Sequence, residues 1–266
     1  MAMKDFLEER RSVRDFKKQS LDEGTLKKIT DMLYEKNELS KGHSVKFSLY
    51  TDGKQVYDGL NGYGGYKGVM ISAPHYISME ILDQEDLGLV YGSYYLESII
   101  TKLTDLGVGS CWVTIVDAPD DIVEKTLNTA NRVDFLLAIG NPAGEYSFGS
   151  LNYSSREGVE SYVRDSSLKN PIQMEKLESY GLDELFNYLR YAPSTRNEQG
   201  WRFVLENDHF DLYMKETNLI ENLVDAGIVM YYYSALAEYE NIKVEWTMDK
   251  DAKKADGYIY IASANF

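Results

Sequence analysis

Residues Asp86–Leu106 read DLGLVYGSYYLESIITKLTDL, which is long enough for about six turns of helix. If the segment is helical, its leucine, isoleucine, valine and tyrosine side chains cover nearly the whole circumference. A helix with so little polar surface must be buried on most sides. Gly107 and Gly109 end it. The rest of the chain therefore has to supply elements that cover this helix.

The segments on either side of this helix predict a mixed α+β fold. An amphipathic helix is expected at Leu21–Lys36, and Val45–Thr51 alternates like a strand that meets an Asp52-Gly53 turn. Further strands are expected at His75–Ile81, Ser110–Val116 and Asp134–Gly140, with a helix at Pro119–Leu127 and a short one at Lys4–Glu9.

The second half of the chain shows the same order of elements. A second broadly apolar helix is expected at Leu219–Tyr239. Around it lie a helix at Asp183–Arg190, a hairpin of Arg202–Leu205 and Phe210–Met214, and strands at Lys243–Met248 and Tyr258–Ala262. Two similar halves would bury their apolar helices against each other across a pseudo-twofold axis, as identical subunits do in a homodimer. An α+β domain whose halves are alike by chance is the alternative.

Composition excludes several classes of function. The 266 residues include 43 acidic and 28 basic side chains, a net charge of −15, which gives no general attraction for nucleic acid or anionic lipid. The single cysteine, Cys111, and three scattered histidines predict neither a disulfide nor a metal site. No apolar run approaches the length of a membrane helix, and residues 1–14 are too charged for a signal peptide. We therefore expect a cytoplasmic protein.

One cluster of basic residues stands out from this acidic background. Arg10-Arg11-Ser12-Val13-Arg14 gathers three guanidinium groups and a hydroxyl, which suit the oxygens of a phosphate. The alternative is a solvated basic face paired with Glu8, Glu9 and Asp15.

A second cluster is polar but carries little net charge. Ala192–Trp201 reads APSTRNEQGW, with hydroxyls and carboxamides that could bind the edge of a heterocycle or a polyol. The alternative is a helix stop, in which Pro193 ends one element and Ser194 or Asn197 caps the next. Spacing alone does not separate the two interpretations.

Together the two clusters resemble the motifs of the FMN-dependent nitroreductase family. Arg10–Phe16 resembles the family's Arg-x-Ser-x-Arg/Lys-x-Phe motif, and Ala192–Trp201 its Ala-Pro-Ser-x-x-Asn-x-Gln-Pro-Trp motif, with Gly200 in place of the second proline. Leu106–Val113 resembles the strand beside the flavin ring, and Ala138–Pro142 a later strand end. Arg156 resembles a late basic phosphate ligand. The resemblance implies an α+β nitroreductase-like fold.

The motifs are in an unusual order, because the polar loop of ordinary members comes soon after the arginine motif. Here the corresponding stretch, Asn37–Phe47, lacks the signature, and an intact copy lies in the second half. The resemblance thus implies that one chain imitates a family dimer, with lobes at 1–165 and 166–266 and a single FMN site. Cofactor contacts are then expected from Arg10, Arg11, Ser12, Arg14 and Arg156 of the first lobe and from Pro193, Ser194, Thr195, Asn197 and Gln199 of the second.

The resemblance also implies which groups lie near the flavin ring. A backbone amide is expected near its N5 atom, at Thr114 or Ile115. The glycine-rich loop Gly62–Gly68 would flank the flavin, with Lys67 a minor candidate for the pyrimidine carbonyls; a plain surface loop is the alternative. No catalytic acid or base and no metal is expected, since the flavin itself carries the chemistry.

The expected function is that of an oxidoreductase. NADH or NADPH would reduce FMN, which would pass electrons to a nitroaromatic, a quinone or a similar small acceptor. Because both lobes are in one chain, we expect a monomer. The alternative is a non-catalytic protein that binds or stores flavin, or a scaffold whose site has degenerated.

Overall fold

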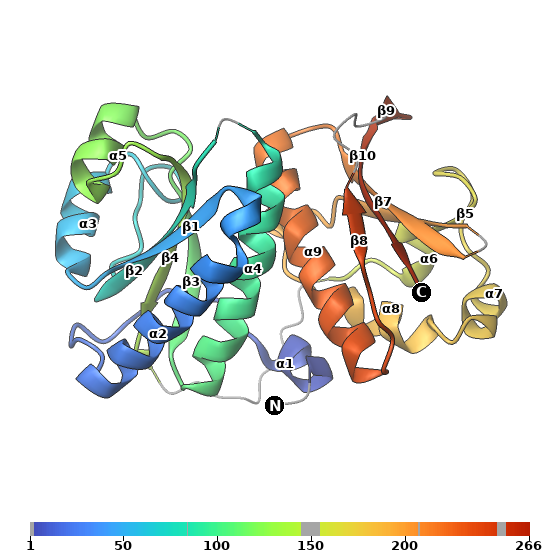
Figure 1. Ribbon diagram of the computed structural model, residues 1–266, viewed down its shortest axis with the longest axis horizontal. Helices are drawn as coiled ribbons and strands as arrows, with labels where there is room; N and C mark the ends of the chain where they lie inside the picture. Colours follow the sequence, from blue (N-terminus) through green and yellow to red (C-terminus); the bar gives the residue numbers. More distant parts are fainter. Residues whose placement is uncertain (1–2, 84, 145–154, 207, 249–253) are drawn as a thin grey trace. The chain divides into compact units, whose positions relative to one another are not determined.

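The computed structural model describes residues 3–83, 85–144, 155–206, 208–248 and 254–266. These form two compact units, which we name the N-terminal unit (Arg10–Ser150) and the C-terminal unit (Met1–Glu9 with Leu151–Phe266) (Figure 1). This division differs from the expected boundary at residue 165. Strand β5 (Val163–Asp165) pairs with the later strand β6 (Trp201–Leu205), which places residues before 166 with the second half of the chain.

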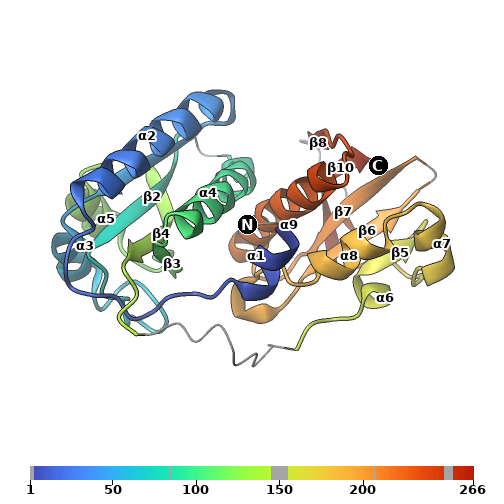
Figure 2. The ribbon, with the colours of Figure 1, turned by 90° about the horizontal axis from the view of Figure 1, so that it is seen from below.

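The first helix also lies in the C-terminal unit. Helix α1 (Met3–Glu9) contacts α8 (Asp183–Leu189) and α9 (Leu219–Tyr239), as Figure 2 shows. The Lys4 ammonium holds it there through carboxylate oxygens of Glu184 and Glu240, at 2.8 and 2.9 Å. Sequence pattern gives no sign of this contact, because it joins residues more than 170 positions apart.

The N-terminal unit is built on a four-stranded antiparallel sheet. Its strand order is β1 (Val45–Tyr50), β2 (His75–Ile81), β4 (Arg132–Gly140) and β3 (Gly109–Thr114). Helices α2 (Glu23–Leu39) and α4 (Leu87–Asp105) cover one face, and α3 (Gly53–Leu60) and α5 (Asp120–Leu127) the other (Figures 1 and 2). Strand β2 is therefore buried on both faces.

Helix α4 has the expected span and the expected burial. Gly92 lets it approach β2 closely, since a Cβ at this position would lie 2.6 Å from Sδ of Met79. The one carboxylate in its buried part, Glu97, accepts a hydrogen bond of 2.8 Å from the Trp112 indole on β3. An apolar helix surface and a satisfied buried acid together fix α4 against the sheet.

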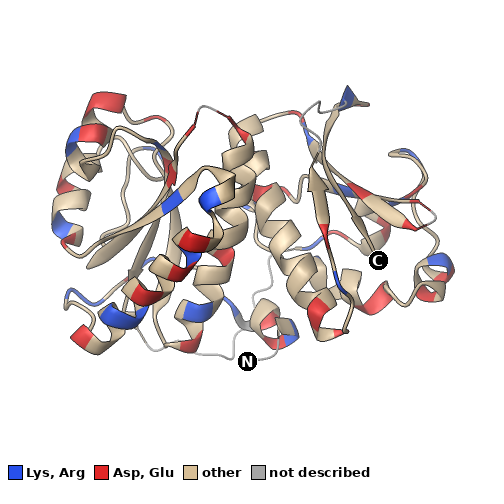
Figure 3. Cartoon of the chain, in the orientation of Figure 1, with Lys and Arg blue, Asp and Glu red and all other residues tan. Residues whose placement is uncertain are grey.

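The C-terminal unit contains a second sheet, ordered β5, β6, β7 (His209–Lys215), β10 (Tyr258–Asn265) and β8 (Trp246–Met248), with β9 (Lys254–Ala255) paired to β10. Helix α9 matches its expected span and carries few charged residues (Figure 3). Its Tyr233 packs on Phe210 and Trp246, with ring centroids 4.7 and 5.8 Å apart. The unit also includes the short helices α6 (Val159–Tyr162) and α7 (Met174–Ser179).

The two sheets share one topology. The order β1-β2-β4-β3 of the N-terminal unit corresponds to β6-β7-β10-β8 of the C-terminal unit, with α4 and α9 at the same point of the chain order. In both units a helix leads through a 3₁₀ turn into the first of these strands, at η1 (Lys41–His43) and η2 (Thr195–Asn197). The predicted succession of elements is thus present in both units.

One expected turn is instead the start of a helix. The Asp52 side chain accepts a hydrogen bond of 3.1 Å from the Gln55 amide and so caps α3. Gly53 is required there because a Cβ would collide with the backbone of Ala73 and Pro74. An Asp-Gly pair serves a turn or a helix cap equally well, so the pattern favoured the wrong element.

No helix among the described residues is both long enough and apolar enough to cross a membrane.

His75 joins the segment after the arginine cluster to the sheet. Its Nε2 atom accepts a hydrogen bond from the Leu21 amide at 3.0 Å and lies 3.2 Å from the Ser20 hydroxyl oxygen. A backbone amide only donates, so Nε2 is unprotonated and the proton is on Nδ1, which donates to the Thr51 carbonyl at 2.9 Å. Burial lowers the pKa of this histidine.

We expect this lowered pKa to make folding sensitive to acid. The unfolded chain takes up a proton on His75 near pH 6.5, and the folded chain does so only at lower pH, so stability is lost as pH falls below about 6.5. Urea unfolding at pH 7.5, 6.5 and 5.5 should show that the stability advantage of wild type over His75→Gln narrows with acid. Parallel pH curves for the two proteins would contradict this assignment.

Candidate functional site

The arginine segment runs beside β3 and the end of β4. The Val13 amide donates to the Ser110 carbonyl at 2.9 Å, and Phe16 pairs with Pro142. Gly109 makes room for this contact, because a Cβ there would lie 2.6 Å from a methyl carbon of Val13. Three segments singled out in the sequence, at 10–16, 106–113 and 138–142, therefore meet in one place.

Two basic side chains of this segment, Arg10 and Arg14, lie without an acidic partner among the described residues. A guanidinium nitrogen of Arg10 lies 3.4 Å from the Ser12 hydroxyl, and Arg14 is exposed. Within the described part of the chain, no acidic side chain forms an ion pair with Arg10 or Arg14. Burial raises the pKa of the nearby Cys111 thiol, and the charges of Arg14 and Arg10 act in the opposite direction. The geometry thus favours an anion site over a paired basic surface for these two arginines.

Arg11 differs from its neighbours. Its side chain is exposed and donates to the Arg10 carbonyl at 3.1 Å. It therefore supports the backbone of the segment.

The glycine-rich loop lies at the other end of β3. The Gly65 amide donates to the Thr114 carbonyl at 2.7 Å, and the Gly62 amide closes the loop onto the Gly68 carbonyl at 2.9 Å. Lys67 is exposed, and its ammonium lies 5.4 Å from the centre of the Tyr66 ring. The structure thus brings this loop to the strand end where Thr114 was singled out.

Backbone amides at Thr114 and Ile115 were expected near a flavin ring, and only one of them faces away from the neighbouring strand β4. The Ile115 amide donates to the Asp134 carbonyl at 2.8 Å and is committed to the sheet. Because alternate residues of an antiparallel ladder point to opposite sides, the Thr114 amide points away from β4. Thr114 is therefore the better candidate for a backbone donor, and Ile115, which is buried, contributes packing.

The polar loop of the C-terminal unit has an unusual backbone. After Pro193 the chain makes the turn η2, and three residues of the loop, Arg196, Asn197 and Gln199, have φ of 52°, 60° and 47°. The Ser194 hydroxyl accepts from the Gln199 amide at 3.0 Å. Side chains with a Cβ rarely occupy this left-handed region, so other contacts must hold the loop in place.

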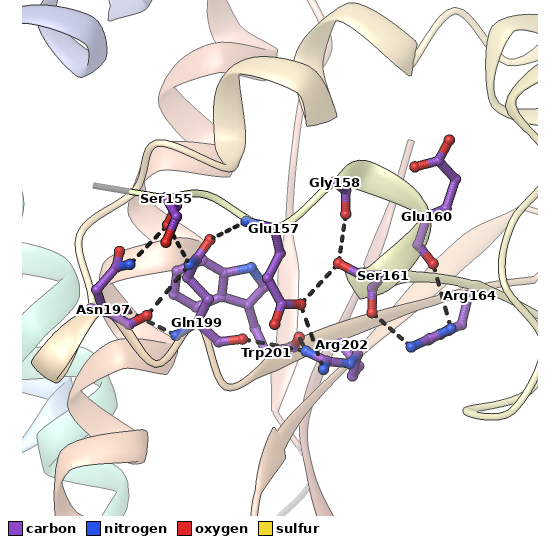
Figure 4. Close-up of polar contacts among 11 residues, drawn as sticks. Ser155, Glu157, Gly158, Glu160, Ser161, Arg164, Asn197, Gln199, Trp201 and Arg202 are labelled. Carbon is purple, nitrogen blue, oxygen red and sulfur yellow. Dashed lines mark hydrogen bonds and ion pairs between the residues drawn. The ribbon is translucent and has the colours of Figure 1, made fainter. Parts of the chain in front are cut away.

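Those contacts come from Ser155, Arg156 and Glu157, which we name the brace. Figure 4 shows two of them, Ser155 and Glu157. The Asn197 carboxamide accepts from the Arg156 guanidinium at 2.7 Å and donates to the Ser155 carbonyl at 2.9 Å. The Gln199 carboxamide accepts from the Glu157 amide at 3.0 Å. The predicted loop residues are thus brought together, but with partners from within the chain.

The position of Arg156 corrects the expectation that it belongs with the first lobe. It lies in the C-terminal unit, and a guanidinium nitrogen donates to the Ala192 carbonyl at 3.1 Å as well as to Asn197. The sequence resemblance identified the residue but not its partners.

Sequence reasoning missed two buried ionisable residues beneath the loop. Arg202, next to Trp201 at the end of the motif, donates to the Gln199 carbonyl at 3.3 Å, and its guanidinium lies 3.7 Å from a Glu157 carboxylate oxygen (Figure 4). Asp225 of α9 accepts from the Thr195 amide at 3.0 Å and from its hydroxyl at 3.2 Å. An acid in the middle of an apolar helix was the available signal for Asp225.

Gly200, which replaces the family's proline, has a local explanation. A Cβ at this position would lie 2.8 Å from the Asn222 side-chain oxygen. The Asn222 carboxamide is fixed by hydrogen bonds to the carbonyls of Lys215 and Thr217. The substitution thus accommodates a neighbouring side chain and does not mark a disrupted loop.

Comparisons with known proteins agree with this architecture. A sequence profile of the family described as "Putative TM nitroreductase" matches residues 2–237. A crystal structure described as a "putative nitroreductase", from Thermotoga maritima MSB8, is 18% identical, with a TM-score of 0.60 over 98% of this chain and 93% of that chain. No curated protein sequence matches.

Two further solved structures are similar over less of the chain. Nitroreductase A from Vibrio parahaemolyticus is 18% identical, with a TM-score of 0.50 over 75% of this chain and 89% of that chain. An FMN-dependent nitroreductase from Clostridium difficile is 24% identical, with a TM-score of 0.43 over 53% and 87%. The likeness to the Thermotoga protein confirms the nitroreductase-like α+β fold.

Asp225 gives the loop a testable pH dependence. Burial raises the pKa of Asp225 to about 8, so the folded chain keeps a proton that the unfolded chain releases near pH 4. Stability is therefore lost as pH rises from about 4 to about 8. The Asp225→Asn variant has no carboxyl group at this position and therefore lacks this loss. In urea unfolding, the stability of the variant relative to wild type should increase between pH 5 and pH 9. Glu238 is exposed on the same helix, and Glu238→Gln is the control. If unfolding stability changed with pH equally in both variants, the assignment would be refuted.

Proposed function

The chain belongs to the nitroreductase family described as "Putative TM nitroreductase", and we propose that it is an FMN-dependent oxidoreductase. In this proposal NADH or NADPH supplies the electrons, and a nitroaromatic, a quinone or a similar small molecule receives them. The observation that carries the proposal is the arginine segment held against β3, with two guanidinium groups that lack acidic partners among the described residues.

The chemistry of this segment fits the FMN phosphate. Arg10 and Arg14 offer charged donors and Ser12 a hydroxyl, all within five residues. Charge-assisted hydrogen bonds from guanidinium groups are among the strongest that a protein offers to a phosphate. In the proposal these three residues hold the phosphate, and the Ser194–Gln199 loop is the second segment whose sequence resembles a flavin-binding motif.

When bound, FMN supplies the capacity to accept a hydride and to pass electrons on. The chain's contribution is to orient the cofactor and to offer a hydrogen-bond donor. The outward-facing Thr114 amide suits this role, because a strand backbone is rigid and its donor needs no reorganisation. Lys67, exposed on the loop bonded to Thr114, is a candidate for the flavin carbonyls.

A non-catalytic flavin carrier is the second candidate, and one observation favours it. The carboxamides of Asn197 and Gln199 already have hydrogen-bond partners in the brace. A loop whose polar groups are satisfied within the chain can hold a ligand by shape without contributing new hydrogen bonds. Reduction by a nicotinamide separates the two candidates.

We expect the purified protein to bind one FMN per chain, because one arginine segment and one intact polar loop are present. Absorbance near 450 nm and phosphorus analysis measure this stoichiometry. Bleaching of the absorbance by NADH or NADPH supports the oxidoreductase proposal. A bound flavin that is reduced by neither nucleotide supports the flavin-carrier proposal. Two FMN per chain would contradict the single-site proposal.

Arg14→Ala should weaken FMN binding by about 1.5–3 kcal/mol, the usual contribution of a hydrogen bond to a charged group. Lys18→Ala, an exposed cation near the same segment, controls for the change in net charge and should leave the affinity unchanged. Fluorescence titration of the flavin-free protein measures both. Equal FMN affinities for Arg14→Ala and wild type would indicate that the arginine cluster is only a solvated basic surface.

A further inference from the structure

We propose that Arg156 is a positioning residue that holds the Ser194–Gln199 loop in its flavin-binding conformation and is not a ligand of the flavin phosphate. The inference deepens the proposed function and rests on it. It reassigns a residue whose sequence context suggested the phosphate.

The loop needs support from outside its own backbone. Arg196, Asn197 and Gln199 all have left-handed φ angles, which side chains with a Cβ rarely adopt. Such a conformation persists only when surrounding contacts over-determine it. The side chains of two of these residues, Asn197 and Gln199, are the ones that the brace binds.

Arg156 reaches the start and the middle of the loop at once. One nitrogen, Nη1, donates to the Ala192 carbonyl at 3.1 Å and to Oδ1 of Asn197 at 2.7 Å. Oδ1 is thereby the acceptor end of the carboxamide, and Nδ2 donates to the Ser155 carbonyl at 2.9 Å. The Arg156 donor and the Ser155 acceptor together fix the orientation of the Asn197 carboxamide.

The brace is itself anchored. A carboxylate oxygen of Glu157 accepts from the Ser161 hydroxyl at 2.8 Å and lies 3.7 Å from the buried Arg202 guanidinium. Arg202 also donates to the backbone carbonyls of Gln199 and Trp201. Arg156 thus lies in the chain between Ser155 and Glu157, whose own hydrogen bonds to the loop are shown in Figure 4. Arg14, by contrast, is exposed and has no acidic partner among the residues described.

Two flavins distinguish a positioning role from phosphate binding. FMN and riboflavin differ in the phosphate, so loss of a phosphate ligand weakens FMN binding alone, and loss of loop positioning weakens both. Fluorescence titration of Arg156→Ala should show Kd raised by about tenfold for both flavins, with an unchanged ratio. Arg14→Ala is the matched control and should raise Kd for FMN alone.

Two more variants sharpen the assignment. Arg156→Gln keeps an N–H donor without the charge and should recover part of the lost affinity for both flavins. Arg156→Ala combined with Asn197→Ala should cost little more than Asn197→Ala alone, because the arginine acts through that side chain. A rise in Kd for FMN alone, or no change for either flavin, would overturn the proposal.

A measurement without flavin separates this proposal from the proposed function. Hydrogen exchange of the 192–200 backbone in the flavin-free protein should be faster in Arg156→Ala than in wild type or Arg14→Ala. If wild type binds no flavin and exchange is faster, the proposed function fails and Arg156 still positions the loop. If exchange is unchanged, the positioning role fails, whatever the protein binds.

Discussion

The outer edge of β3 is the constraint on which the polar segments of the N-terminal unit depend. Backbone donors and acceptors must be satisfied, and β3 offers outward carbonyls at Ser110 and Thr114 that β4 cannot reach. Val13 takes the first and Gly65 the second. The arginine segment and the glycine-rich loop are therefore fixed to two points of one strand, Ser110 and Thr114, with three residues between them. Their side chains follow from that attachment.

The connections at η1 and η2 show how one topology can serve two purposes. In the N-terminal unit, Asn37 of α2 closes the connection by donating to the Phe47 carbonyl at 2.9 Å and accepting from its amide at 2.7 Å. The Asn37 carboxamide thus links helix α2 to strand β1. In the C-terminal unit the carboxamides lie in the turn itself, and a separate segment, the brace, binds them. Only the second arrangement places carboxamide side chains in the turn itself, and the corresponding stretch Asn37–Phe47 lacks that part of the motif.

The parts of the fold that could be predicted are those that local pattern determines. Helices α4 and α9 were located closely because more than five turns of nearly continuous apolar surface admit few alternatives. The Asp52-Gly53 pair misled because a cap and a turn use the same residues. The motifs of the candidate site could be proposed from the sequence, but the contacts that their side chains make could not. The partners of Arg156, and the buried Asp225 under Thr195, depend on residues 30 or more positions away.

The charge around each side chain explains why Arg156 cannot exchange roles with Arg10 and Arg14. The chain carries a net charge of −15, so an anionic ligand meets no long-range attraction, and screening limits each charge to about 8 Å at physiological ionic strength. Affinity for a phosphate must therefore come from guanidinium groups that have no carboxylate partner, and among the described residues Arg10 and Arg14 meet this condition. Arg156 instead directs its Nη1 atom to the neutral oxygens of Ala192 and Asn197. The effect of Arg156 is to order the loop, and it influences ligand binding through the shape of that loop.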